Sequence, residues 1–173
     1  MRTTKKITVS AMMTALGSAF MAAGAIWDVL DMSLAALASF LIVMVLIEVG
    51  SPYPWLVWIS TSLITALLFP GSTVWLMYFV FGVFPILKYY IEKLKRPFWF
   101  PIKLIYVNVS IIGLIYVLDF VFGTPIFATD LPIIKAGLYL LLNIAFFMYD
   151  RLITLIVRVY NEKYRRLFRH LFK

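Results

Sequence analysis

The hydropathy pattern of the chain consists of six long apolar runs separated by short polar or turn-forming stretches. The runs cover residues 7–27, 32–48, 53–69, 73–87, 100–118 and 132–150. Each run is continuously apolar and does not alternate with polar residues, which predicts helices rather than barrel strands. A helix needs about 20 mostly apolar residues to cross the hydrocarbon core of a bilayer. The pattern therefore predicts an all-α polytopic membrane protein with six transmembrane helices.

Composition supports this prediction. Hydrophobic residues make up 64% of the 173 positions and charged residues 14%, which is outside the range of soluble globular proteins. A water-soluble chain of this size would have to bury nearly two thirds of its residues, whereas lipid lets most of them face outward. We expect a single integral membrane domain over residues 1–173 and no soluble domain.

Positive charge is concentrated on one side of the predicted bundle. Lys and Arg residues precede the first run, surround the connection between the fourth and fifth, and follow the sixth. With six spans these regions share one face, and only Lys135 lies on the other. The positive-inside rule then places both termini in the cytoplasm of a cell-membrane protein. The net charge of +8 thus reflects topology and attraction to the lipid bilayer, and we expect no nucleic-acid partner.

The two ends of the chain each have an alternative interpretation. The basic start, the first apolar run and Ala23-Gly24-Ala25 also fit a secretory signal peptide with its cleavage site. Cleavage of the first span would leave five spans, and the basic segments would then no longer share one membrane face. We therefore expect this helix to be retained. Residues 151–173 predict an amphipathic cytoplasmic helix, either lying along the membrane surface as an anchor or serving as a docking arm.

Residues suited to catalysis or metal binding are scarce. The chain has no cysteine, and its one histidine, His170, lies beside Arg169 without a carboxylate or a second ligand at metal spacing. There is no phosphate-binding glycine loop of the Walker type. We therefore expect no enzyme activity, no metal and no cofactor, and any energy for transport must come from other subunits.

Polar residues in and beside the spans are candidates for contact with a small-molecule ligand. Asp28, Asp31 and Asp119 lie at predicted outer ends of spans. One interpretation is that they cap helices, as Asp31 would cap a helix beginning at Met32. The alternative is that they line the mouth of an outward-facing cavity. Asn108 and Asn143 fall near the middle of neighbouring antiparallel spans. They either bond to each other or contact a ligand, because an unbonded amide in hydrocarbon is costly.

Aromatic residues gather in the outer half of the predicted bundle. These are Trp27, Trp75, Tyr78 and Tyr116. The first interpretation is an interfacial aromatic belt. The alternative is that some of the rings, Trp75 among the candidates, stack on a planar ligand.

Small residues form a stripe along the first span. Ala11, Ala15, Ser18, Ala22 and Ala25 follow steps of four and three residues, and Gly17 and Ala19 border them. Small residues let membrane helices approach closely, where lipid provides no hydrophobic drive for association. The stripe predicts a contact surface, facing either another span of the bundle or a separate protein.

The segment "KKITVSAMMTALGSA" resembles the alanine-x-x-x-alanine signature of the substrate-binding S components of energy-coupling factor transporters. The following "DMSLAALASFLIVMVLIEVGSP" is similar to the second span of that family. The resemblance implies a subunit that captures a small substrate in an outward cavity and topples against a membrane scaffold driven by two ATPases. Ala11 and Ala15 would contact that scaffold, with Ser18 or Ala19 extending the seam.

Two hypotheses of different class follow. The first is the substrate-capture subunit of such an importer, with Asp28, Asp31, Trp75, Asn108, Asp119 and Asn143 as the substrate-binding candidates. The second is a small polytopic interaction or assembly protein without a transported ligand. The scarcity of polar residues in the spans supports the second, because even an apolar binding site has a few orienting polar groups.

Overall fold

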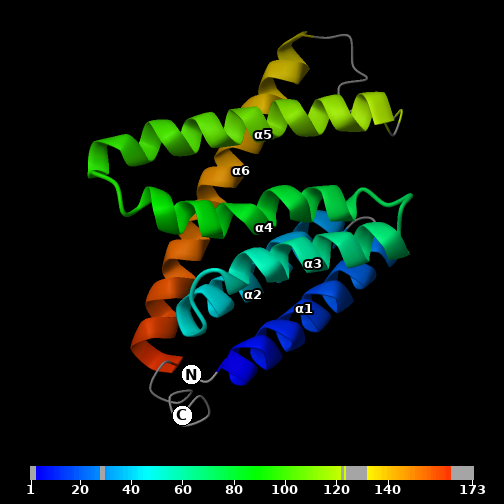
Figure 1. The fold of residues 1–173 in the computed structure, drawn as a ribbon. Helices are drawn as coiled ribbons and strands as arrows, with labels where there is room; N and C mark the ends of the chain where they lie inside the picture. Colours follow the sequence, from blue (N-terminus) through cyan, green and yellow to red (C-terminus); the bar gives the residue numbers. More distant parts are fainter. Residues whose placement is uncertain (1–2, 28–29, 122, 124–131, 165–173) are drawn as a thin grey trace. The chain divides into compact units, whose positions relative to one another are not determined.

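The computed structural model describes residues 3–27, 30–121, 123 and 132–164, and within them all regular structure is helical. Figure 1 shows the elements along the chain. They are α1 (Thr3–Ile26), α2 (Asp31–Glu48), α3 (Tyr53–Leu68), α4 (Val74–Ile91), the 3-10 helix η2 (Arg96–Phe98), α5 (Trp99–Val121), α6 (Pro132–Val159) and the π-helix η3 (Tyr160–Tyr164). The prediction of an all-α protein is confirmed.

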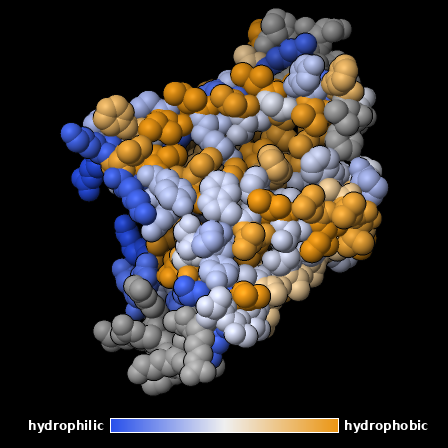
Figure 2. Space-filling view, viewed as in Figure 1, coloured by the Kyte–Doolittle hydropathy of each residue, from blue (hydrophilic) through white to orange (hydrophobic). Residues whose placement is uncertain are grey.

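Five of these helices are long and apolar enough to cross a membrane, and α3 is apolar but only 16 residues long. Large apolar side chains are exposed along the helices, among them Leu67 at 81%, Phe120 at 79% and Ile133 at 83%. Figure 2 shows such side chains, in orange, over much of the visible surface. Exposed apolar area of this extent is unfavourable in water and is expected in lipid. The fold therefore indicates a helical membrane protein.

Several helices extend past the apolar runs that predicted them. α1 begins at Thr3 rather than at residue 7, α4 continues to Ile91 rather than 87, and α6 continues past 150 to Val159. A helix satisfies its backbone hydrogen bonds internally, so it need not end where the hydrocarbon ends. The first part of the predicted tail is thus a continuation of α6, and residues 165–173 lie outside the described part of the chain.

A short turn reverses the chain between α2 and α3. Gly50 has a φ of 80°, in the left-handed region that favours glycine, and its N–H donates to the Val45 carbonyl at 3.1 Å. Pro52 and Pro54 then flank the start of α3, where the first amides of a helix have no intrahelical partner and proline is tolerated. The "GSPYP" stretch therefore acts as the break that its residue types predict.

The chain forms two compact units, one made of Met1–Tyr90 and Val157–Lys173 and the other of Ile91–Ile156. In the first unit α1 packs against both α2 and α3 (Figure 1). Its packing is tight at Gly82 of α4, where an added Cβ would lie 2.7 Å from Cδ1 of Trp58. The Trp58 indole N–H donates to the Phe79 carbonyl at 3.1 Å, which holds the ring against this glycine. The absence of a side chain at Gly82 of α4 thus makes room for the Trp58 ring of α3.

Candidate functional site

α1 packs inside the first unit through a face of small residues that the sequence stripe did not include. Four residues of α1 are buried: the large Met21 and the three small residues Ser10, Gly17 and Gly24. A Cβ on Gly17 would lie 3.3 Å from Cγ2 of Thr61 in α3, and one on Gly24 would lie 2.9 Å from Cγ2 of Val74 in α4. These distances leave little or no room for a side chain. The close internal contact of α1 therefore uses its glycine face, which we define as Ser10, Gly17 and Gly24.

The predicted contact residues lie on a different side of α1. Ala11, Ala15 and Ala19 are exposed, and Ser18 is half-buried. Successive residues are about 100° apart around a helix, so these alanines are turned away from the glycine face. We refer to Ala11, Ala15 and Ala19 as the alanine face. It is a smooth, exposed surface on a helix whose internal packing is made elsewhere.

The acidic candidates of the first unit lie at the connection between α1 and α2. Asp28 is outside the described residues. Asp31 is itself the first residue of α2, one position earlier than the predicted helix start, and its carboxylate accepts a hydrogen bond from the Met32 amide. It also accepts one from the Thr73 hydroxyl at 3.4 Å. Asp31 therefore has a local structural role at the start of α2.

The outer aromatic residues do not share one environment. Trp27 and Tyr116 are exposed at 61% and 67%, as residues of an interfacial belt would be, and Trp75 is half-buried in α4. Tyr78 is only 1% exposed, so its predicted place in the belt is wrong. Its ring lies beside Gly82 one turn further along α4, where the absence of a side chain gives it space inside the first unit.

Asn108 and Asn143 are connected through a third residue of the second unit. The Asn108 amide nitrogen donates to the Leu104 carbonyl at 2.7 Å, and its oxygen accepts a hydrogen bond from the Tyr139 hydroxyl of α6. The Asn143 amide donates to the Tyr139 carbonyl at 3.0 Å. The expected bonding between α5 and α6 therefore runs through Tyr139 rather than directly between the two amides.

Asp119 lies near the end of α5 beside a hollow of about 490 Å³. The hollow is lined by Ile112, Ile115, Tyr116, Asp119 and Phe120, and the Tyr116 and Phe120 rings are nearly parallel with centroids 5.8 Å apart. All five residues belong to one helix. Of the predicted substrate-binding candidates in the second unit, Asp119 lines this hollow, whereas Asn108 and Asn143 take part in the Tyr139 contacts.

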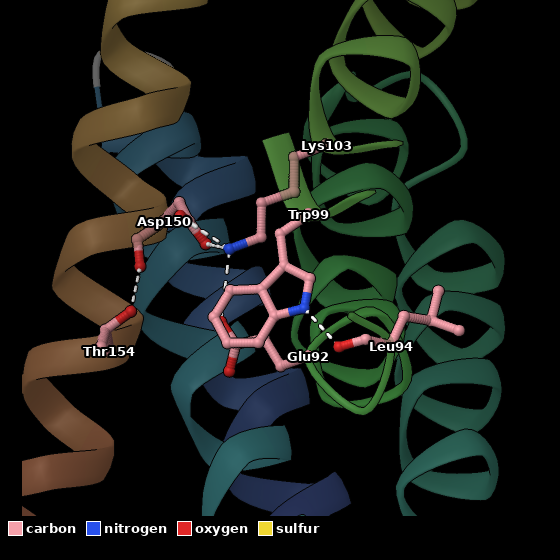
Figure 3. A network of polar contacts seen from close by, with 6 residues as sticks. All are labelled: Glu92, Leu94, Trp99, Lys103, Asp150 and Thr154. Atoms are coloured by element: carbon pink, nitrogen blue, oxygen red, sulfur yellow. Dashed lines mark hydrogen bonds and ion pairs between the residues drawn. The ribbon is translucent and has the colours of Figure 1, made fainter. Parts of the chain in front are cut away.

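The second unit also contains an ion-pair cluster, which Figure 3 shows. Lys103 of α5 contacts both carboxylate oxygens of Asp150 in α6, at 2.9 and 3.0 Å, and one carboxylate oxygen of Glu92 at 3.3 Å. The ammonium group has three N–H donors, and these three contacts match that number. We call Glu92, Lys103 and Asp150 the charge cluster.

Burial makes the charge cluster energetically important. The Lys103 and Asp150 side chains are 8% and 12% exposed, and Glu92 is 35% exposed. A buried charge is tolerated only when it is paired, since removal from water is otherwise expensive. The cluster contains two carboxylates and one ammonium group. Among the described residues no group of three or more His, Cys, Asp and Glu side chains is suited to hold a metal ion.

The sequence prediction missed the pairing of Lys103 with Asp150, although a signal for it existed. Lys103 lies inside the fifth apolar run, and Asp150 is the last residue of the sixth. Consecutive spans are antiparallel, so these opposite charges fall at a similar depth near the same membrane face. Ionisable residues inside spans usually pair with one another, and this depth match was the usable clue.

The helices and the exposed apolar surface define the class of the protein as a helical membrane protein with several candidate spans. Comparison with known proteins adds no narrower assignment, because no family model, curated protein or solved structure matches the chain.

Proposed function

We propose that this chain is the membrane-embedded substrate-capture subunit of an importer of the energy-coupling factor type, energised by a separate scaffold and ATPases. In this proposal the alanine face of α1 contacts the scaffold, and a vitamin-like or other micronutrient is the ligand. The chain itself carries out no catalysis. It resides in the cell membrane with six spans and both termini in the cytoplasm.

The observation that carries the proposal is the presence of two distinct small-residue faces on α1. The glycine face already makes the close contacts with α3 and α4. The alanine face is exposed, although alanine gives little apolar area for contact with lipid. Small side chains are useful where another helix backbone must approach closely. An exposed small-residue face therefore supports docking to a second membrane protein.

Contacts at the helix ends support the proposed topology. The Lys6 ammonium lies 5.7 Å from the centroid of the Tyr53 ring, so the starts of α1 and α3 are neighbours. The Tyr160 hydroxyl donates to the Glu48 carboxylate at 2.9 Å, which joins the chain after α6 to the end of α2. In a six-span topology, the starts of α1 and α3 and the ends of α2 and α6 all lie at the same membrane face. These contacts favour an arrangement in which both termini share one side.

A pull-down of the tagged chain from its native membranes tests the docking role. The wild-type chain should co-purify with a membrane scaffold and ATPases. Ala15→Trp should reduce their recovery by about tenfold or more, because a bulky ring prevents close helix approach and a loss of 1.4 kcal/mol corresponds to tenfold in affinity.

Leu16→Trp is the matched control for this experiment. Leu16 is 46% exposed on the same helix but faces about 100° away from Ala15. This variant should retain the partners. Normal association of folded Ala15→Trp, or equal losses in the two variants, would contradict docking through the alanine face.

The second candidate is an assembly protein without a transported ligand, and one observation favours it. Asn108 and Asn143, predicted to contact a ligand, make hydrogen bonds within the second unit. A native mass spectrum of the purified chain separates the two candidates. A retained small molecule that is found in repeated preparations supports capture, whereas its consistent absence supports the assembly role.

A further inference from the structure

We propose that the connection between α4 and α5 binds the headgroup of an anionic phospholipid. The proposed site consists of residues 93–100, with the sequence KLKRPFWF, and we call it the basic-aromatic connection. It is independent of docking through the alanine face, because it lies on different helices and takes a lipid rather than a protein partner.

The charges of the connection favour an anionic ligand. Lys95 and Arg96 are exposed, and residues 93–100 include no acidic side chain. The nearest carboxylate in sequence, Glu92, contacts Lys103, which also binds Asp150. The charge cluster thus pairs this carboxylate with a buried cation. Arg96 and Lys95 are suited to a phosphate, since a guanidinium group binds two phosphate oxygens and an ammonium group attracts them.

The connection is held in shape by its own hydrogen bonds. The Trp99 indole N–H donates to the Leu94 carbonyl at 2.9 Å, and the Phe98 amide donates to the Lys95 carbonyl at 3.0 Å. Both bonds span Arg96 and close the turn that contains it. The two exposed cations are therefore presented from an ordered turn at the start of α5.

Apolar side chains beside the cations indicate a lipid rather than a free anion. Leu94, Phe98 and Phe100 are 52%, 56% and 63% exposed. The Phe100 ring stacks on Phe147 with centroids 5.6 Å apart, which positions it between α5 and α6. Cations flanked by exposed rings suit the membrane interface, where the charges meet phosphates and the rings reach the acyl chains. Free phosphate would gain nothing from the rings.

Native mass spectrometry of the purified full chain, titrated in neutral detergent with phosphatidylglycerol or phosphatidylcholine, tests this proposal. The wild-type chain should bind phosphatidylglycerol more tightly. Lys95→Gln/Arg96→Gln should reduce the affinity for phosphatidylglycerol by about 25-fold, since each of the two basic residues near an anionic surface contributes about a factor of five. The affinity for phosphatidylcholine should change little.

Two further variants separate a defined site from diffuse attraction. Arg151→Gln/Arg158→Gln removes the same charge from exposed positions of α6 and should have a much smaller effect. Phe98→Ser should weaken the binding of both lipids. Equal binding of the two lipids by the wild-type chain, equal losses in the two charge variants, an unchanged Phe98→Ser variant, or displacement of phosphatidylglycerol by millimolar inorganic phosphate would each overturn the proposal.

Discussion

Lys103 forms a buried ion pair in the second unit. Its ammonium group contacts Asp150 and Glu92, and its side chain is only 8% exposed. Either buried charge alone would be costly, so each is tolerated because of the other. This pairing links the first turns of α5 to α6. It also explains how ionisable residues are accommodated within long apolar helices.

Substitution of Lys103 should therefore be strongly destabilising. Lys103→Met leaves Asp150 buried without its cation and should lower the free energy of unfolding by about 3–5 kcal/mol. The double variant Lys103→Met/Asp150→Leu removes both charges and should recover most of the loss. Unfolding by SDS in mixed micelles measures both. A single variant as stable as the wild type would show that the ion pair has no stabilising role.

The sequence identifies polar and charged residues within the spans more readily than it identifies their partners. Asn108 and Asn143 stood out because amides are costly in hydrocarbon, and the predicted polar link between their helices exists. The link runs through Tyr139, whose phenol is common in apolar segments and gave no signal by itself. Lys103 and Asp150 are 47 positions apart, and their contact depends on the packing of α5 against α6.

At the scale of elements, glycines determine where helices approach closely. Gly17 and Gly24 of α1 face Thr61 and Val74, and Gly82 of α4 faces Trp58. An added Cβ would come too close to its neighbours at Gly24 and Gly82 and would be tightly packed at Gly17. Membrane helices associate by such close contact, because lipid supplies no hydrophobic drive between them. The glycines therefore contribute to the packing of the first unit.

Gly82→Ala should destabilise the protein by about 1–3 kcal/mol, the usual cost of overpacking. The new Cβ would lie 2.7 Å from a Trp58 ring that a hydrogen bond holds in place. Gly113→Ala in α5 is the matched control, because no atom beyond its own stretch of helix lies within 4 Å of its added Cβ. This variant should be unaffected or slightly stabilised by alanine's higher helix propensity. Similar unfolding midpoints for Gly82→Ala and the wild type would contradict the packing described.

The existence of the helices was predictable, whereas their ends and packing faces were not. Continuous apolar runs revealed the helices, because no other element buries such a run so readily in lipid. The ends moved outward at Thr3, Ile91 and Val159, since a helix continues through polar residues without losing its internal hydrogen bonds. The alanine stripe was visible as a spacing, but only the structure distinguished its exposed side from the glycine face.

At the scale of the whole molecule, the distribution of charge and the contacts at helix ends favour the same topology. All Lys and Arg residues except Lys135 belong to the predicted cytoplasmic side. The Lys6–Tyr53 and Tyr160–Glu48 contacts join helix ends that this topology places together. Five candidate spans and the short α3 are consistent with six crossings.

Single-cysteine labelling measures the topology directly, because the chain has no native cysteine to give background. Lys135→Cys should react with a membrane-impermeant maleimide in intact cells. Lys95→Cys should react only after the membrane is permeabilised, since the positive-inside rule places its connection in the cytoplasm. Both positions are exposed. Labelling of Lys95→Cys in intact cells would contradict the proposed orientation.

The proposed function depends on contact between the alanine face of α1 and another membrane protein. Photo-cross-linking in native membranes tests it most directly, with a benzoylphenylalanine placed at Ala15 or at Leu16 of otherwise wild-type chains. We expect a defined adduct with a scaffold subunit from position 15 and little or none from position 16. Equal adducts from both positions, or none from position 15 in a folded and membrane-inserted chain, would contradict it.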